Sequence, residues 1–206
     1  MKVLIYMPFA DWVPHLATDL EIAAKHIDAG DEVHIIQCSG DLPACEPNPN
    51  HFSFRCKNCQ ARRDKGLLLI DIAQERRHEL DLGHYSKDTK FPRFSSIREL
   101  MMFEVEGLDA GSTVASSLIS MIREPNPDVT KYEEFVSRNL SMVVAVHRAV
   151  KARLEEIQPD VFYLFNGRYA PLRPALRAAQ ELGITTYVHE RAGVLDRYSL
   201  AENTYP

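Results

Sequence analysis

Short apolar runs alternate with amphipathic stretches at the start of the chain. Residues 2–8 are mostly apolar and predict a buried strand, whereas residues 15–29 place apolar side chains at helical spacing. Gly30 ends this helix, and the apolar run 33–36 predicts a second strand. The order of strand, helix and strand predicts a βαβ unit with parallel strands.

The same order returns near the C-terminus. Residues 160–167 form a run whose continuous apolar centre predicts a strand buried on both faces. A helix is predicted over 171–182, Gly183 ends it, and the run 184–190 predicts another strand. The sequence therefore predicts a second βαβ unit, again with parallel strands.

A mainly helical segment, residues 61–157, lies between the two units. Helical spacing of apolar positions predicts helices over 67–82, 97–105, 112–122 and 131–157. No third strand is evident, and we expect it to be absent or to lie within 84–94. The predicted fold is α/β: a Rossmann-like open parallel sheet with flanking helices and a mainly helical insertion, in one domain spanning 1–206.

Composition excludes two broad classes of protein. The chain has 206 residues, 45% of them hydrophobic, and a net charge of −5, so no broad basic face for nucleic acid is expected. Its apolar runs fall well short of the roughly 20 residues that cross a bilayer. The apolar N-terminus is interrupted by Asp11 and is too short for a signal peptide, which predicts a cytoplasmic protein.

All four cysteines lie in one stretch, CSGDLPACEPNPNHFSFRCKNC, at Cys38, Cys45, Cys56 and Cys59. Cytosolic thiols are kept reduced, which favours a metal over disulfides. Cys56 and Cys59 form a CxxC pair, the spacing with which a tight turn presents two thiolates to zinc. We predict a structural zinc held by the four cysteines within a loop spanning 38–60.

Other interpretations of the cysteines stay open. His51 is a spare ligand, and an iron–sulfur cluster or unligated thiols that form disulfides during handling are alternatives. Four thiolates leave no open position on zinc, which argues against a catalytic metal. A thioredoxin-type role is disfavoured because its CxxC motif normally follows a strand and opens a helix.

Ligands of open parallel sheets bind outside the carboxyl ends of the strands. One predicted strand ends in FNGR, where Gly167 allows a tight bend and Asn166 precedes a helix. Arg168 can hold a carboxylate or phosphate through a forked hydrogen bond, or pair with a surface acid. We take Asn166, Gly167 and Arg168 as candidate substrate-binding residues.

The next strand ends in HERAG, which offers a second set of polar groups. His189 and Glu190 point in opposite directions if they end a strand, so only one faces the cleft. Glu190 can orient a sugar hydroxyl or act as a base, and Arg191 is a candidate substrate contact. The alternative is a polar strand end with a surface Glu–Arg pair.

The first strand leads into FADWVPH. His15 can bond a ligand hydroxyl or serve as a general base, although a histidine at such a place is more often a partly exposed loop residue. Asp11 is a further candidate for substrate binding. Trp12, the only tryptophan, belongs to the core or stacks on a sugar, and the core is favoured.

A helix rich in small residues begins at GSTVASSLIS. Free backbone N–H groups at Gly111 and Ser112 can receive an anion or an acceptor hydroxyl, or the small residues simply allow close packing. The sequence has neither a GxGxxG fingerprint nor a P-loop, which argues against a nucleotide-binding oxidoreductase. It also lacks the GxSxG elbow of serine hydrolases.

Several of these stretches together resemble one family. MKVLIYMPF with Trp12, GDEVHIIQCSGDLPAC, CKNC, DAGSTVASSLIS, FNGR and HERAG…YSLAENTYP resemble the N-terminal half of bacterial GT-B glycosyltransferases of capsule and surface-polysaccharide gene clusters. The resemblance implies one half of a GT-B fold that binds a glycan or lipid-linked acceptor. It also implies that a C-terminal domain binds the nucleotide-sugar donor, and it allows a peripheral position at the inner membrane.

The sequence departs from that family pattern by stopping at Pro206, before a donor-binding domain. The expected function is the acceptor-binding half of a glycosyltransferase, inactive without the donor domain, with His15 and Glu190 as catalytic candidates. The alternative is a non-catalytic Rossmann-like module that binds carbohydrate or anions.

Overall fold

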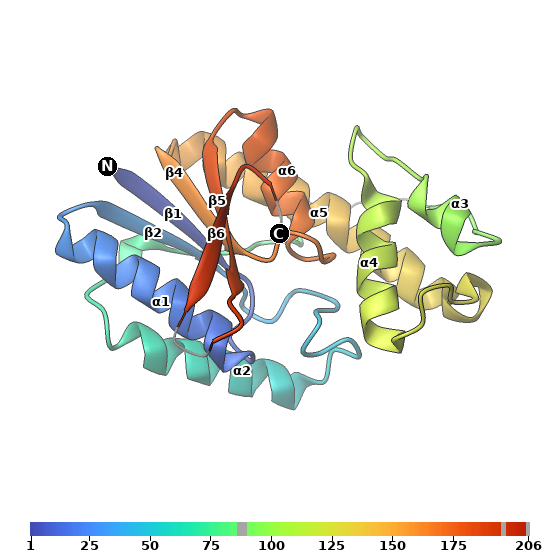
Figure 1. Cartoon of the computed structure of the whole chain (residues 1–206), viewed down its shortest axis with the longest axis horizontal. Helices are drawn as coiled ribbons and strands as arrows, with labels where there is room; N and C mark the ends of the chain where they lie inside the picture. The colour runs from blue at the N-terminus through green and yellow to red at the C-terminus, as the bar shows by residue number, and fades with distance from the viewer. Residues whose placement is uncertain (86–89, 195–196, 205–206) are drawn as a thin grey trace.

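A mostly parallel sheet forms the centre of the protein in a computed structural model that describes residues 1–85, 90–194 and 197–204 (Figure 1). Within this part of the chain the sheet has six strands in the order β3-β2-β1-β4-β5-β6. The strands are β1 (Lys2–Met7), β2 (Glu32–Gln37), β3 (Arg77–Glu79), β4 (Val161–Phe165), β5 (Thr185–Arg191) and β6 (Tyr198–Glu202). Only β6, which pairs antiparallel with β5, departs from the parallel arrangement among the described strands.

Helices cover both faces of the sheet (Figure 1). They are α1 (Val13–Asp28), α2 (Ser53–Leu67), α3 (Ile97–Met101), α4 (Ala110–Ile122), α5 (Glu133–Ile157) and α6 (Arg173–Glu181), with 3-10 turns η1 (Gln74–Arg76) and η2 (Val129–Tyr132). Helices α1 and α2 lie on one face, and α5 and α6 lie on the other. The prediction of an open α/β sheet with flanking helices is confirmed, and the predicted parallel arrangement holds for all the described strands except β6, which the sequence did not predict.

Strand β1 shows how the two faces are divided. Leu4 and Tyr6 belong to the core under α4, α5 and α6, whereas Val3 and Ile5 belong to the core under α1 and α2. All four side chains are fully buried. This two-sided burial follows from the alternation of side chains along a strand and explains the continuous apolar run in the sequence.

The insertion differs from its prediction. The prediction of a helix over 67–82 is wrong, because the third strand, β3, lies inside that range and pairs with β2. Helix α2 begins at Ser53 and so takes up the last third of the loop expected over 38–60. The alternative place for the third strand, 84–94, holds no strand among its described residues, and 86–89 lie outside them.

Helices α3 and α4 lie beyond the carboxyl ends of the strands, and the long α5 connects them to the sheet (Figure 1). The C-terminal half of α5 buries Val150 and Leu154 in the sheet core, and its N-terminal half packs beside α4. The loop between β4 and α6 extends toward α4. This arrangement leaves room beside the strand ends, where ligands of such sheets bind.

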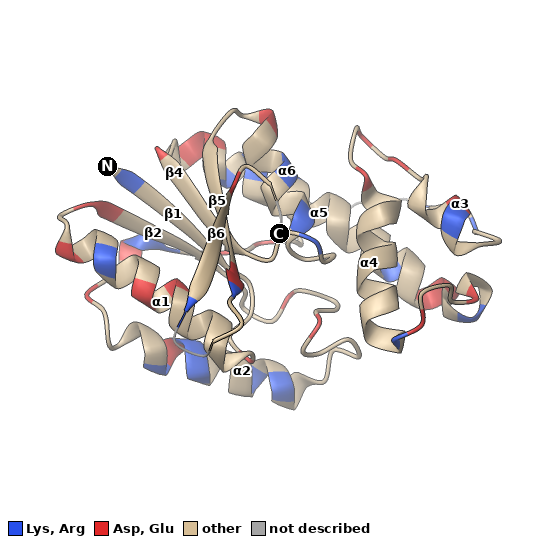
Figure 2. Ribbon diagram, in the orientation of Figure 1, with Lys and Arg blue, Asp and Glu red and all other residues tan. Residues whose placement is uncertain are grey.

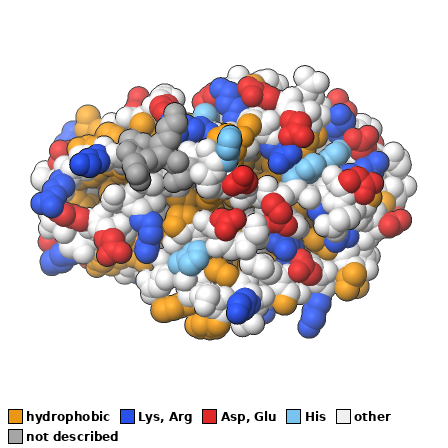
Figure 3. Space-filling model, turned by 180° about the vertical axis from the view of Figure 1, so that it is seen from behind, with side chains coloured by type: hydrophobic (Ala, Val, Ile, Leu, Met, Phe, Trp, Pro, Cys, Tyr) orange, Lys and Arg blue, Asp and Glu red, His pale blue; other side chains and the backbone are white. Residues whose placement is uncertain are grey.

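Charges of both signs are spread over the elements (Figure 2). On the face opposite to that of Figure 1, acidic and basic side chains alternate with hydrophobic ones, and neither sign forms a continuous patch among the described residues in view (Figure 3). The distribution matches the small net charge of −5. No helix in the described ranges has the length and apolar character needed to cross a membrane.

Candidate functional site

Two adjoining hollows lie beyond the carboxyl ends of the strands. The larger, which we name the α4 groove, has a volume of about 590 Å³ and runs between α4 and the segment joining β4 to α6. The smaller, which we name the inner pocket, has a volume of about 330 Å³ and lies between α4 and the loop after β2. Ser120, Arg123 and Tyr169 line both, so the two hollows are continuous.

The α4 groove has a polar wall and a cationic wall. Ser112, Ser116 and Ser120 recur every fourth residue along α4 and so lie on one helical face. The facing wall consists mainly of Arg168, Tyr169 and Arg173, and Arg123 stands at the C-terminal end of α4. The predicted candidates Ser112 and Arg168 therefore lie on opposite walls of the same groove.

The inner pocket contains an acid that sequence reasoning missed. Glu46 Oε1 accepts a hydrogen bond from Ser117 Oγ at 2.5 Å, and that same Oγ accepts one from the Ala170 N–H at 2.8 Å. Glu46 Oε2 is buried and has no hydrogen-bond partner among the described residues. Burial raises the pKa of Glu46 to about 7, against an opposing effect of the Ser117 hydrogen bond. The group can therefore gain or lose a proton near neutral pH.

The structure brings three predicted residues together at the ends of β4 and β5. Asn166 Nδ2 donates to Glu190 Oε2 at 2.7 Å, and Asn166 Oδ1 accepts from the Arg168 N–H at 3.1 Å. The left-handed backbone at Asn166 (φ 60°) and Gly167 (φ 69°) makes the sharp turn that allows both bonds. The FNGR turn thus fixes the Glu190 carboxylate at the strand edge.

His15 completes this cluster from the start of α1. Its ring stacks on Phe165, with 3.7 Å between the ring centroids. Burial lowers the pKa of His15, and the negative charge of Glu190 opposes that shift. The imidazole is therefore neutral at neutral pH and can accept a proton, which is the property required of a general base.

His189 and Glu190 differ in environment, as expected for neighbours on a strand. His189 is completely buried, and its Nε2 lies 2.7 Å from Asp19 Oδ1 on α1. Glu190 is half-buried at the strand edge. We therefore assign the buried His189–Asp19 pair to the attachment of α1 to the sheet and Glu190 to the surface site.

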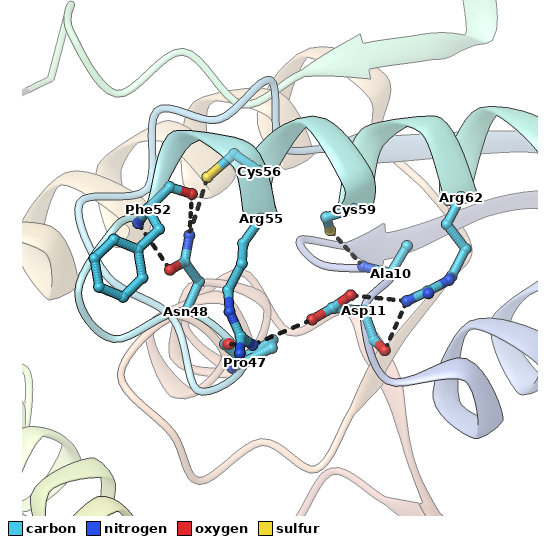
Figure 4. A network of polar contacts seen from close by, with 9 residues as sticks. All are labelled: Ala10, Asp11, Pro47, Asn48, Phe52, Arg55, Cys56, Cys59 and Arg62. Atoms are coloured by element: carbon cyan, nitrogen blue, oxygen red, sulfur yellow. Dashed lines mark hydrogen bonds and ion pairs between the residues drawn. The ribbon is translucent and has the colours of Figure 1, made fainter.

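Two predicted substrate contacts, Asp11 and Gly111, also have structural roles. Asp11 forms ion pairs with Arg62 at 2.7 Å and Arg55 at 3.8 Å, and these pairs tie the β1–α1 turn to α2 (Figure 4). At Gly111 an added Cβ would lie 1.8 Å from the Leu100 backbone oxygen. A glycine is required there because α3 and α4 pack so closely, and its predicted role in binding stays a prediction. Arg191 is exposed at the end of β5.

Trp12 contacts the core and also lines the candidate site, so it has both of the environments expected for it. Its ring packs edge-on against Phe9 and Phe165, with 5.5 and 6.0 Å between ring centroids. It also lines the inner pocket together with Tyr169. The tryptophan is therefore a rigid, partly buried wall, the kind of surface on which a sugar ring can rest.

The four cysteines surround a pocket of about 30 Å³, room for roughly one water molecule. Three sulfur atoms each accept a hydrogen bond. Cys59 accepts from the Ala10 N–H at 3.0 Å and Cys56 from Asn48 Nδ2 at 3.3 Å (Figure 4), and Cys38 accepts from the Gly40 N–H at 3.2 Å. Burial raises the pKa of Cys38, Cys45 and Cys59, which favours the neutral thiol.

The predicted zinc ligand set is not formed by this arrangement. No group of three or more His, Cys, Asp or Glu side chains is placed to hold a metal ion within the ranges that the structure describes. The physical reason is that Cys56 and Cys59 lie within α2 rather than on a tight turn, with their sulfur atoms directed to different partners. His51 Nδ1 bonds to the Leu42 carbonyl instead.

Comparison with known proteins adds little about the family or the function of the chain. No family model matches the chain, and no curated protein matches it. Among solved structures, the zinc-inhibited form of a teicoplanin deacetylase aligns with 92% of this chain and 67% of its own, at 14% identity and a TM-score of 0.43. Similarity of this degree assigns neither a family nor an activity.

Proposed function

We propose that the chain is the N-terminal, acceptor-binding half of a GT-B type glycosyltransferase. In this proposal a sugar passes from a nucleotide-sugar to a glycan or lipid-linked acceptor, and a C-terminal domain holds the donor. The observation that carries the proposal is the cluster of His15, Asn166 and Glu190 beside a continuous polar hollow, all at the carboxyl ends of parallel strands.

Each group of the cluster has a defined part in an inverting transfer. An acceptor hydroxyl attacks the anomeric carbon of the donor, and the bond from that carbon to the nucleotide diphosphate breaks. His15 takes the hydroxyl proton, since its lowered pKa keeps the imidazole neutral at neutral pH. Asn166 holds the Glu190 carboxylate, whose negative charge stabilises the imidazolium that forms.

The proposal is tested by separating binding from turnover. We expect the purified 206-residue chain to bind oligosaccharide acceptors and to transfer no sugar from any nucleotide-sugar. Binding is measured by calorimetry and transfer by release of the nucleoside diphosphate. Robust turnover by the pure chain, or acceptor binding that survives blocking of both hollows by bulky substitutions at Ser116 and Ser120, contradicts the proposal.

A non-catalytic module that binds carbohydrate or anions is the second candidate. It is favoured by the α4 groove, whose cationic wall binds ligands without chemistry. The gene distinguishes the two: a reading frame that continues beyond Pro206 into another α/β half favours the transferase, and a stop codon there favours the module.

Structural zinc remains a separate proposal for the cysteine pocket. It is supported by the meeting of all four thiols at one pocket, and it requires their side chains to turn inward. Metal analysis of freshly purified protein tests it. Near-stoichiometric zinc that is lost in Cys56→Ser supports the proposal, and metal-free folded protein with four titratable thiols rejects it.

A further inference from the structure

The α4 groove contains positive charge that the protein does not neutralise. Arg123 and Arg168 line the groove, and neither forms an ion pair within the part of the chain that the structure describes. The Arg168 guanidinium instead lies over the Tyr169 ring, 5.4 Å from its centroid. Both arginines are exposed, so their charged ends can reach a ligand.

A third arginine adds to the positive potential of this wall. Arg173 pairs with Asp109, and the same carboxylate accepts from Arg177 Nη2 at 2.7 Å. One carboxylate thus faces two guanidinium groups beside the groove. The described lining of the groove contains no Asp or Glu that would oppose an incoming anion.

Three serines of α4 supply uncharged hydrogen-bond donors along the opposite wall of the groove. Ser112, Ser116 and Ser120 extend along α4, and the wall from Ser112 to Arg123 is about 17 Å long at the rise of an α-helix. That length accommodates a diphosphate together with a sugar. Hydroxyl and guanidinium groups are the side chains that recognise phosphate oxygens.

The two ends of the hollow also differ in charge. Glu46 and Asn139 line the inner pocket, whereas Arg168 and Arg173 line only the groove. An anionic group is therefore attracted to the groove end, and a hydroxyl-bearing sugar fits beside Trp12 in the inner pocket. The net charge of −5 and the interspersed charges on the face drawn in Figure 3 offer no extended basic track for a polynucleotide among the described residues in view.

From these observations we propose that the α4 groove is a phosphate subsite: it binds the phosphate or diphosphate of a phosphorylated sugar acceptor through Arg123 and Arg168, and the sugar lies toward Glu46. This inference rests on the proposed acceptor-binding function and names its substrate class. It assigns Arg123, Ser116 and Ser120 to a site in which only Ser112 and Arg168 were expected from the sequence.

The test uses inorganic pyrophosphate as the probe in calorimetric titrations of the 206-residue chain. We expect wild-type protein to bind it with an affinity that falls as salt rises. The double variant Arg123→Gln/Arg168→Gln is expected to bind at least tenfold more weakly. The matched control Lys57→Gln/Lys65→Gln removes two exposed positive charges from α2 and is expected to stay within twofold of wild type.

Absence of pyrophosphate binding by the wild-type chain overturns the inference, and so does an equal loss of affinity in the control variant. A parallel titration with a neutral oligosaccharide separates the two proposals. If the oligosaccharide binds and pyrophosphate does not, the phosphate subsite is wrong and acceptor binding stands. If pyrophosphate binds and no sugar or sugar phosphate does, the subsite stands and the proposed acceptor function is wrong.

Discussion

The cysteine pocket and the α4 groove both lie beside the carboxyl ends of the strands, yet they differ in almost every physical respect. The cysteine pocket holds about 30 Å³ and its bordering charges are paired, as in the ion pairs of Asp11 with Arg55 and Arg62. The α4 groove holds about 590 Å³ and includes two arginines without a described acidic partner. Neutralised charges in a closed space hold elements together, whereas unpaired charges on an open wall are available to a ligand.

This difference changes the importance of the cysteines. Their clustering in the sequence is conspicuous, but their thiols accept hydrogen bonds from nearby backbone and side-chain groups. They connect α2 and the loop after β2 to the strand ends. This difference agrees with a structural role for the cysteine pocket and with the ligand-binding role proposed above for the groove.

The largest effect is expected when the proposed general base, His15, is removed. If the reading frame continues into a donor-binding domain, His15→Ala in that longer protein is expected to lower the transfer rate by about 10²–10⁴-fold, the usual contribution of general acid–base catalysis. His84→Ala, an exposed histidine outside the cluster, is the control and is expected to keep the wild-type rate. Equal rates for His15→Ala and wild type in steady-state assays would remove His15 from the mechanism.

The packing of α4, which forms one wall of the groove, is expected to depend on Gly111. In Gly111→Ala the new methyl group overlaps the Leu100 carbonyl, so α3 and α4 must separate. We expect a loss of about 1–3 kcal/mol in the free energy of unfolding, the usual cost of overpacking. Urea denaturation measures it, with Gly83→Ala as the control because its nearest neighbour lies at an ordinary 3.5 Å. An unchanged midpoint for Gly111→Ala would show that this wall is not tightly packed.

Glu46 gives the inner pocket a pH dependence between pH 4.5 and 7, whereas the pKa values of Cys38, Cys45 and Cys59 are raised from an already alkaline value. Its pKa is about 7 in the folded protein against 4.5 ordinarily, so between these values the folded state keeps a proton that the unfolded state has released. Stability therefore falls as pH rises from 4.5 to 7 and levels off above 7. In Glu46→Gln this contribution, at most about 3 kcal/mol, disappears. Thermal unfolding at pH 5 and pH 8 checks it, and parallel pH profiles for variant and wild type would contradict it.

The smallest effect is expected in the cysteine region. Arg62→Ala removes an ion pair with Asp11 whose two side chains are 41% and 25% exposed. Such pairs contribute about 0–1 kcal/mol, so the midpoint of urea denaturation should move little. Pyrophosphate affinity should not change, because Arg62 lies outside the groove. A large loss of affinity in this variant would show that the two regions act as one site.

The parts predictable from sequence are those with local apolar signals. Strands β1, β2, β4 and β5 are buried, and their continuous apolar runs indicated them. Strand β3 reads Arg-His-Glu and joins the sheet through backbone pairing with β2, so its side chains carry no such signal. Helix α2 exposes most of its polar side chains, which concealed it within the expected loop.

The part of the candidate site that could be predicted from the sequence lies at the carboxyl ends of the strands. Placement at the carboxyl edge brought His15, Asn166 and Glu190 together as expected from the topology of parallel sheets. Glu46 and Arg123 escaped detection because their environment is built by residues far along the chain. Glu46 bonds to Ser117, and Arg123 meets Tyr169 only after α4 packs near the β4–α6 segment.

The central claim, that the α4 groove and not the cysteine pocket receives the ligand, is tested most directly by ¹H–¹⁵N NMR of the chain during titration with a hexose 1-phosphate. We predict that backbone amide shifts concentrate at Ser116, Ser120, Arg123 and Arg168, with residues 38–60 changed only around Glu46. Shifts that concentrate at Cys38, Cys56 and Cys59 while α4 stays unchanged would contradict the account.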